Sequence, residues 1–155
     1  MPGHLANMTE SSRRCFLTVL GGCALAGAGA CSAAAGVPPE HVGDVSAGNI
    51  RDLPVSTLRA LPPHAVAIGR DENGVYAMTL TCTHQGANMA TNGTVDFAAG
   101  VYCYLHGSKF NANGSVVAGP APDPLEHFAV ELDAAGELTI HGGQSVSASS
   151  RTSVA

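Results

Sequence analysis

Short apolar runs bounded by turn residues are the feature that most constrains this chain. They recur from Val42 to Gly142 at a spacing of about eight to twelve residues. Asn-Gly pairs begin at positions 73, 92 and 113, and such pairs suit tight turns because both residues tolerate a positive φ. No segment of this region sustains a long helical period, whereas Phe128–Leu132 alternates apolar and other side chains as a half-buried strand does. The pattern predicts an all-β fold, an antiparallel sandwich or a small barrel.

The expected strands follow these apolar runs, and the clearest hairpin has its turn at Asp71–Gly74. A proline-rich loop at 120–124 separates the later runs. It must lie outside any strand ladder, because proline has no N–H to donate. The expected strands are residues 66–68, 75–78, 94–97, 101–103, 115–117, 128–132 and 138–141.

Size and charge limit the function of the chain. Its 155 residues allow one compact domain with some extra sequence, and 45% hydrophobic residues are too many for a disordered chain. The formal net charge is −5, and the seven Lys and Arg residues form no cluster that could neutralise a row of phosphates. The composition therefore excludes nucleic acid as a partner. An acidic surface would instead suit a basic protein partner.

Residues 1–31 have the layout of an export signal, in which a basic pair precedes a weakly apolar run and then small residues. The segment around Arg13 and Arg14 resembles the twin-arginine signature. That pathway moves folded proteins, so the resemblance implies a cofactor inserted in the cytoplasm before export. A chance Arg pair in a general secretory signal is the alternative. The expected location is the periplasm or the cell surface.

The sequence leaves open how this signal ends. Ala28-Gly29-Ala30 fits a cleavage site before Cys31, whereas a lipid on Cys23 or Cys31, or an uncleaved signal anchor, would tether the protein to a membrane. We expect residues 32–48 to be a flexible tether. Residues 143–155 are Ser-rich and have no apolar period, so we expect them to be a disordered tail.

Two short segments bring together cysteine and histidine. The first reads Cys82-Thr83-His84-Gln85-Gly86 and the second Cys103-Tyr104-Leu105-His106-Gly107. Two thiolates and two imidazoles make a ligand set that suits iron or zinc. Each segment follows an expected strand, so both loops are expected at one end of the sheet.

These segments and their surroundings resemble the Rieske family of [2Fe–2S] proteins over residues 44–142. Four motifs occur in the family's order: CTHQG, CYLHGSKF, the turn at Asn113-Gly114, and the loop that begins with Gly119 and Pro120. The resemblance implies a Rieske-type antiparallel β-sandwich with a small rubredoxin-like subdomain that binds the cluster. It also implies that the Gly119–Pro120 loop covers the cluster and that Ser108 donates a hydrogen bond to a cluster sulfide.

By the same resemblance, Cys82 and Cys103 would hold one iron of the [2Fe–2S] cluster. His84 and His106 would hold the other iron. Two neutral imidazoles in place of two thiolates leave the oxidised cluster uncharged, which makes it easier to add an electron. The family's potentials therefore lie between about −150 and +300 mV.

The chain departs from the high-potential members of the family in two respects. Those members carry a second cysteine in each loop, joined as a disulfide, at the places where Ala87 and Leu105 stand here. They also carry a tyrosine where this chain has Phe110, which has no hydroxyl to donate to a cluster thiolate. These departures predict a middle potential, roughly −50 to +150 mV.

The implied function is one-electron transfer to a redox partner, which could be a cytochrome c, a copper protein or a catalytic oxidoreductase subunit. Arsenite oxidase small subunits are similar in size, export signal and Rieske motifs; a bc-type subunit fits less well because the inter-loop disulfide is missing. Two non-redox alternatives remain for the same loops, a Cys82–Cys103 disulfide and a zinc site. Both leave part of the motif unexplained, since a disulfide does not use the histidines and zinc sites favour C-x₂₋₄-C pairs.

Overall fold

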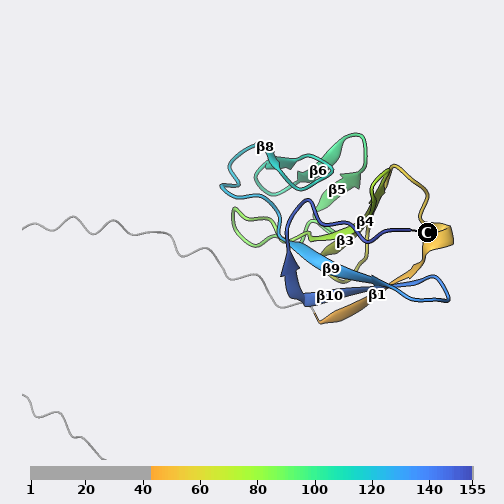
Figure 1. Cartoon of the computed structure of the whole chain (residues 1–155). Coiled ribbons are helices and arrows are strands. Elements are labelled where there is room, and N and C mark those ends of the chain that lie inside the picture. The colour runs from red at the N-terminus through yellow and green to blue at the C-terminus, as the bar shows by residue number, and fades with distance from the viewer. Residues whose placement is uncertain (1–42, 155) are drawn as a thin grey trace, which may run out of the picture. The chain divides into compact units, whose positions relative to one another are not determined.

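The computed structural model describes residues 43–154, which form two antiparallel sheets (Figure 1). The first has six strands in the order β1-β10-β9-β4-β3-β2, and the second has four in the order β5-β6-β7-β8. The predicted all-β antiparallel fold is confirmed. The elements are β1 (Asp44–Asn49), η1 (Ile50–Asp52), β2 (Thr57–Ala60), β3 (Val66–Asp71), β4 (Gly74–Thr79), β5 (Gly93–Asp96), β6 (Gly100–Cys103), β7 (Lys109–Phe110), β8 (Val116–Ala118), β9 (His127–Leu132) and β10 (Glu137–Val146).

The β3–β4 hairpin is the centre of the fold. Its register runs from Val66 opposite Thr79 to Asp71 opposite Gly74, so the turn falls where the Asn-Gly pair predicts it. Every residue of β4 is buried, because successive side chains enter two different cores. Val75 and Ala77 belong to the core of the six-stranded sheet, whereas Tyr76 and Met78 belong to a second core.

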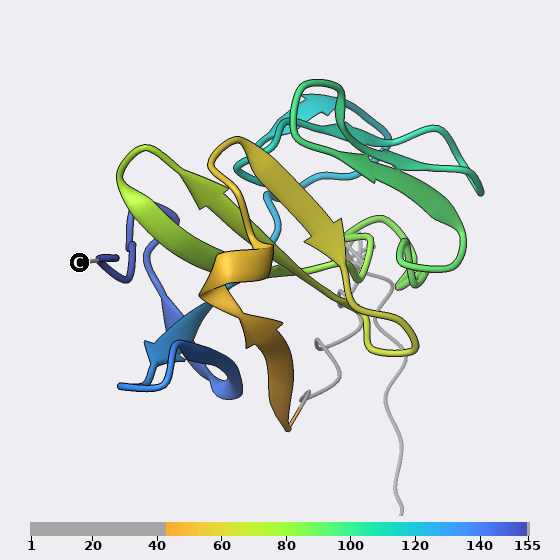
Figure 2. The ribbon, with the colours of Figure 1, turned by 90° about the vertical axis from the view of Figure 1, so that its right-hand side faces the viewer.

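The second core lies between the hairpin and the four-stranded sheet. It contains Met78 of β4 and Leu80, which follows β4, together with Val101 and Phe110 from β6 and β7. Figure 2 shows the four-stranded sheet, coloured green to cyan, lying to one side of the six-stranded sheet. The smaller sheet is thus positioned by apolar contact with one face of the hairpin.

The expected tail at 143–155 is wrong for the residues that the structure describes. β10 continues to Val146, Thr152 forms an isolated antiparallel bridge with Val75 of β4, and Arg151 forms an ion pair with Asp71. The segment is held by backbone hydrogen bonds and one arginine, which a search for apolar periodicity does not detect.

The expected tether at 32–48 is wrong in its last residues. Asp44–Asn49 forms β1, which pairs with β10 at the edge of the large sheet. The rest of the tether and the export signal lie outside the described residues. Within residues 43–154, no helix is long and apolar enough to cross a membrane.

Candidate metal centre

The two loops that carry cysteine and histidine have nearly the same backbone structure. In the first ligand loop (residues 81–92), the N–H of Cys82 donates to Ala87 O at 2.8 Å and that of Gly86 to Cys82 O at 2.8 Å. In the second ligand loop (residues 103–108), Cys103 N–H donates to Ser108 O at 2.9 Å and Gly107 N–H to Cys103 O at 3.0 Å. The same tight turn therefore occurs twice.

A glycine closes each of these turns. Gly86 has φ of +73° and Gly107 has φ of +81°, both in the left-handed region that other residues rarely adopt. The glycine that follows each Cys/His pair in the sequence is thus required by the backbone of the loop.

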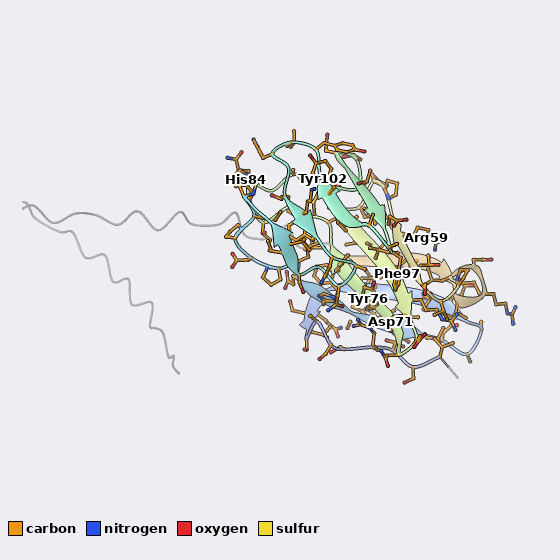
Figure 3. All side chains as sticks on the ribbon, turned by 90° about the horizontal axis from the view of Figure 1, so that it is seen from above. Arg59, Asp71, Tyr76, His84, Phe97 and Tyr102 are labelled. Atoms are coloured by element: carbon orange, nitrogen blue, oxygen red, sulfur yellow. The ribbon has the colours of Figure 1, made fainter. Side chains whose placement is uncertain are left out.

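The turns place the two thiols inside the protein and the two imidazoles toward its surface. Cys82 and Cys103 are buried, whereas His84 is half-buried and His106 is exposed. The two imidazole rings meet edge to face, with 4.8 Å between centroids and 86° between planes. Figure 3 shows His84 at the end of the molecule away from Asp71. The structure therefore brings all four predicted ligands together at one end.

The environment of Cys82 favours a metal as its partner. Burial raises the pKa of the Cys82 thiol. A buried thiolate is costly without a compensating positive charge, and a bound cation supplies one. Both cysteines are free thiols, so the structure does not contain the disulfide that was one alternative.

The imidazole nitrogen His84 Nδ1 is buried and has no hydrogen-bond partner in the described part of the chain. A neutral imidazole nitrogen of this kind can serve as a metal ligand. Within residues 43–154, no three His, Cys, Asp or Glu side chains are placed to hold a single ion. A [2Fe–2S] cluster needs only two protein ligands on each iron, so one sulfur pair and one nitrogen pair fit it. The division of the four ligands between the irons stays a prediction.

Ser108, the last residue of the second ligand loop, connects that loop to the proline loop (Gly119–Leu125). It is fully buried, and its Oγ accepts a hydrogen bond from Ala121 N–H at 3.0 Å. Gly119 and Pro120 are exposed at the start of the proline loop, and its inward contacts come from Ala121 and Leu125. The covering role of Gly119 and Pro120 stays a prediction.

One residue of this region was missed from the sequence. Thr83, between the ligands Cys82 and His84, donates its Oγ1 hydrogen to the carbonyl of Asp123 at 2.7 Å. Its position inside the first motif was the available signal. Its acceptor is a backbone group forty residues away, which no local pattern identifies.

Comparison with known proteins finds a matching family model and relatives that are iron-sulfur proteins. A family model described as Rieske [2Fe-2S] domain matches residues 40–129, more than half of the chain. The iron-sulfur subunit of the cytochrome b6-f complex of Prochlorococcus marinus (strain MIT 9303) is 37% identical over 81 residues, covering 51% of this chain and 44% of that subunit. The corresponding subunit of Chlorobaculum tepidum is 27% identical over 103 residues, covering 63% and 55%. The chain thus spans about half the length of these relatives.

Solved structures with a similar fold include the ferredoxin of carbazole 1,9a-dioxygenase from Nocardioides aromaticivorans IC177. It shares 22% identity at a TM-score of 0.46 and covers 64% of this chain and 98% of its own. The plasma membrane Rieske protein of Synechocystis PCC 6803 shares 24% identity at a TM-score of 0.44, with 62% and 97% covered.

Proposed function

Because this chain belongs to the Rieske [2Fe–2S] family, we propose that it works outside the cytoplasm as a one-electron carrier for a partner oxidoreductase. Family membership implies a Rieske-type [2Fe–2S] cluster and electron transfer. The observed six-stranded and four-stranded antiparallel sheets agree with the all-β fold predicted for that family. Export and the identity of the partner are the new elements of the proposal. The sequence around Arg13 and Arg14 supports export.

One observation carries the electron-transfer role: two buried thiols and two outward imidazoles meet at one end of the molecule. A bound [2Fe–2S] cluster supplies one-electron oxidation and reduction. The chain itself holds the thiols away from water, and Ala121 and Leu125 of the proline loop pack in the same core as both cysteines. His106, the exposed ligand, gives a partner the most direct access to the redox centre.

For the partner, we propose a catalytic oxidoreductase subunit, a cytochrome c or a copper protein. The relatives named above are iron-sulfur subunits of a cytochrome b6-f complex, which supports a role as the small subunit of a larger complex. An arsenite-oxidase-like complex is the first choice, because the chain is similar to arsenite oxidase small subunits in size, export signal and Rieske motifs. A bc-type complex is the second choice, because Ala87 and Leu105 stand where the inter-loop disulfide would be.

The proposal is tested on the full chain expressed with its own N-terminus. We expect the product in the periplasmic or membrane fraction to be red-brown, to contain iron and acid-labile sulfide in equal amounts, and to give a rhombic EPR signal after reduction. A colourless protein with one zinc would contradict the redox role. Arg13→Lys/Arg14→Lys should retain a loaded protein in the cytoplasm, and unchanged export of this variant would contradict the twin-arginine route.

The partner is identified by affinity capture of the native protein from the membrane fraction under mild detergent. We expect a redox protein among the captured subunits, which exchanges electrons with the reduced carrier in a stopped-flow assay. Capture of proteins without a redox centre would count against the small-subunit role.

A further inference from the structure

The two ligand loops are not joined at the positions where high-potential relatives carry their disulfide. Leu105 is 56% exposed, whereas Ala87 is half-buried against the core. Both cysteines of the described chain are free. A tight pair of loops that must keep four ligands in place therefore needs another connection.

The proline loop contacts both ligand loops through hydrogen bonds. Thr83 Oγ1, in the first ligand loop, donates to Asp123 O at 2.7 Å. Ser108 Oγ, in the second ligand loop, accepts from Ala121 N–H at 3.0 Å. The two attachment points are two residues apart in the proline loop, so a single short segment spans both ligand loops.

The proline loop is itself well anchored. Leu125 N–H donates to Gly114 O at 2.9 Å, and Ala121 and Leu125 are 5% and 2% exposed within the core that also contains Cys82 and Cys103. Prolines at positions 120, 122 and 124 fix three φ angles. Because these residues have little freedom to lose, the segment can hold its neighbours at a low entropic cost.

We propose that the proline loop is the non-covalent crosslink between the two ligand loops, and that Thr83 is a positioning residue which completes it. This inference rests on the proposed function, since the geometry being held is that of the cluster ligands. The Ala121 N–H also orients Ser108. A hydroxyl has two lone pairs and one proton, and the Ala121 N–H occupies one of the lone pairs of Ser108 Oγ.

A loop that only covers the cluster would act through its apolar contacts and would not need the Thr83 hydroxyl. A crosslink needs that hydroxyl, because Thr83 is the attachment point on the first ligand loop. The isosteric variant Thr83→Val removes the hydrogen bond without changing the shape of the side chain. Thr83→Ser restores the hydroxyl, and Thr94→Val, at an exposed threonine of β5, is the matched control.

The experiment uses the cluster-loaded full chain under argon, with an excess of an iron chelator. The rate of cluster loss is followed by the decay of the visible absorption at a fixed temperature. We expect Thr83→Val to lose the cluster about fivefold faster than the wild type, which is the effect of one net hydrogen bond. Thr83→Ser and Thr94→Val should stay close to the wild-type rate.

Equal rates for Thr83→Val and the wild type would overturn the crosslink, and so would a fast Thr83→Ser. If Thr83→Val takes up no cluster at all, loading of Thr83→Ser decides: a loaded serine variant supports the role of the hydroxyl, and an empty one refutes it. Circular dichroism shows whether each variant is folded. A wild-type protein without iron and labile sulfide would refute the proposed function instead, so the two failures are distinct.

Discussion

Phe110 is the residue at which a single oxygen atom separates this chain from high-potential relatives. Its ring is 1% exposed and packs in the same core as Cys82 and Cys103. A hydroxyl there would donate to a cluster thiolate and stabilise the reduced form. We expect Phe110→Tyr to raise the reduction potential measurably above the wild-type value, itself predicted at roughly −50 to +150 mV. A redox titration followed by EPR measures both values.

Two outcomes would contradict this reasoning. A wild-type potential above the predicted interval would show that the missing hydroxyl and disulfide matter little. An unchanged potential in Phe110→Tyr would show that the new hydroxyl points away from the thiolates. Phe97→Tyr, at a half-buried phenylalanine between β5 and β6, controls for the added phenol.

His141 of β10 connects three strands of the six-stranded sheet. Its Nδ1 lies 3.1 Å from Asp44 Oδ1 of β1, and its Nε2 lies 3.1 Å from Glu131 Oε2 of β9. The hydrogen bonds with Asp44 and then Glu131 raise the pKa of His141 above 6.5. Because its pKa is higher in the folded state, the stabilisation is complete below the unfolded pKa and is lost as pH rises through the folded one.

We therefore expect His141→Gln to lower the melting temperature at about pH 5.5 and to have little effect at about pH 8.5. The control is His64→Gln, at an exposed histidine between β2 and β3. Differential scanning calorimetry at the two pH values measures the effect. A His141→Gln deficit that is constant with pH would assign the role of His141 to packing alone.

The candidate ligands could be predicted from the sequence, because each Cys/His pair and its glycine lie within one short turn. Gly86 and Gly107 have the positive φ that the turn requires. The contacts that hold the site were not predictable in this way. Thr83 and Ser108 bond to backbone atoms of the proline loop, and backbone donors and acceptors are the same in every sequence.

Among the elements, the strands of strong hairpins were predicted, whereas the edge strands β1 and β2 of the large sheet and the two-residue strand β7 were not. The β3–β4 hairpin has a local turn signal and buried side chains on both strands. β1 and β2 lie at the two edges of the large sheet, where few side chains are fully buried and the apolar pattern is weak. The segment after β10 has almost no apolar pattern, although it is fixed by Arg151 and Thr152.

Arg151 joins three parts of the fold. Its Nε lies 2.7 Å from Asp71 Oδ2 at the β3–β4 turn, and one terminal nitrogen donates to Asn113 Oδ1 at 2.8 Å in the turn before β8. The guanidinium also stacks on the Tyr76 ring, 4.2 Å from its centroid. Burial tends to raise the pKa of Asp71, but the hydrogen bond from Arg151 lowers it below 3.8.

Removal of this arginine should therefore loosen the C-terminal segment and leave the Asp71 carboxylate without its partner. We expect Arg151→Gln to reduce the free energy of unfolding by about 2 kcal/mol at neutral pH, as for a hydrogen bond to a charged group. Urea denaturation of the loaded protein gives the value, with Arg51→Gln, an exposed arginine of η1, as control. Equal midpoints for the two variants would mean that the C-terminal segment is dispensable for stability.

At the scale of the molecule, few charged residues lie in the part of the chain that carries the ligands, and most exposed large apolar side chains of the described residues lie there. The only formal charges between Leu80 and Leu125 are Asp96, Lys109 and Asp123. Of the six large hydrophobic residues that are exposed within residues 43–154, five lie in this segment: Tyr102, Tyr104, Leu105, Val116 and Val117. Asp71, at the β3–β4 turn, lies at the end opposite His84 in Figure 3. The net charge of the chain therefore does not describe the local charge around the ligands, and a partner that docks there need not be basic.

This separation predicts a weak dependence of electron transfer on salt. Charges farther from the redox centre than a Debye length of about 10 Å are largely screened, so the local charge decides the rate. We expect oxidation of the reduced protein by the trianion ferricyanide to change less than about threefold between about 0.01 and 0.5 M salt. If the whole net charge of −5 acted on the oxidant, repulsion would slow the reaction at low salt and the rate would rise steeply with salt.

A matched pair of variants separates the two explanations. Leu105→Glu adds a negative charge between the ligands Cys103 and His106, and should produce a rate that increases strongly with salt. Ser149→Glu adds the same charge to the exposed C-terminal segment, which belongs neither to the four-stranded sheet nor to the ligand loops. This variant should keep the salt dependence of the wild type. Stopped-flow kinetics measure all three proteins. If the oxidation rates of the two variants depended on salt in the same way, the net charge of the whole molecule, and not the charge near the ligands, would control its reaction with ferricyanide.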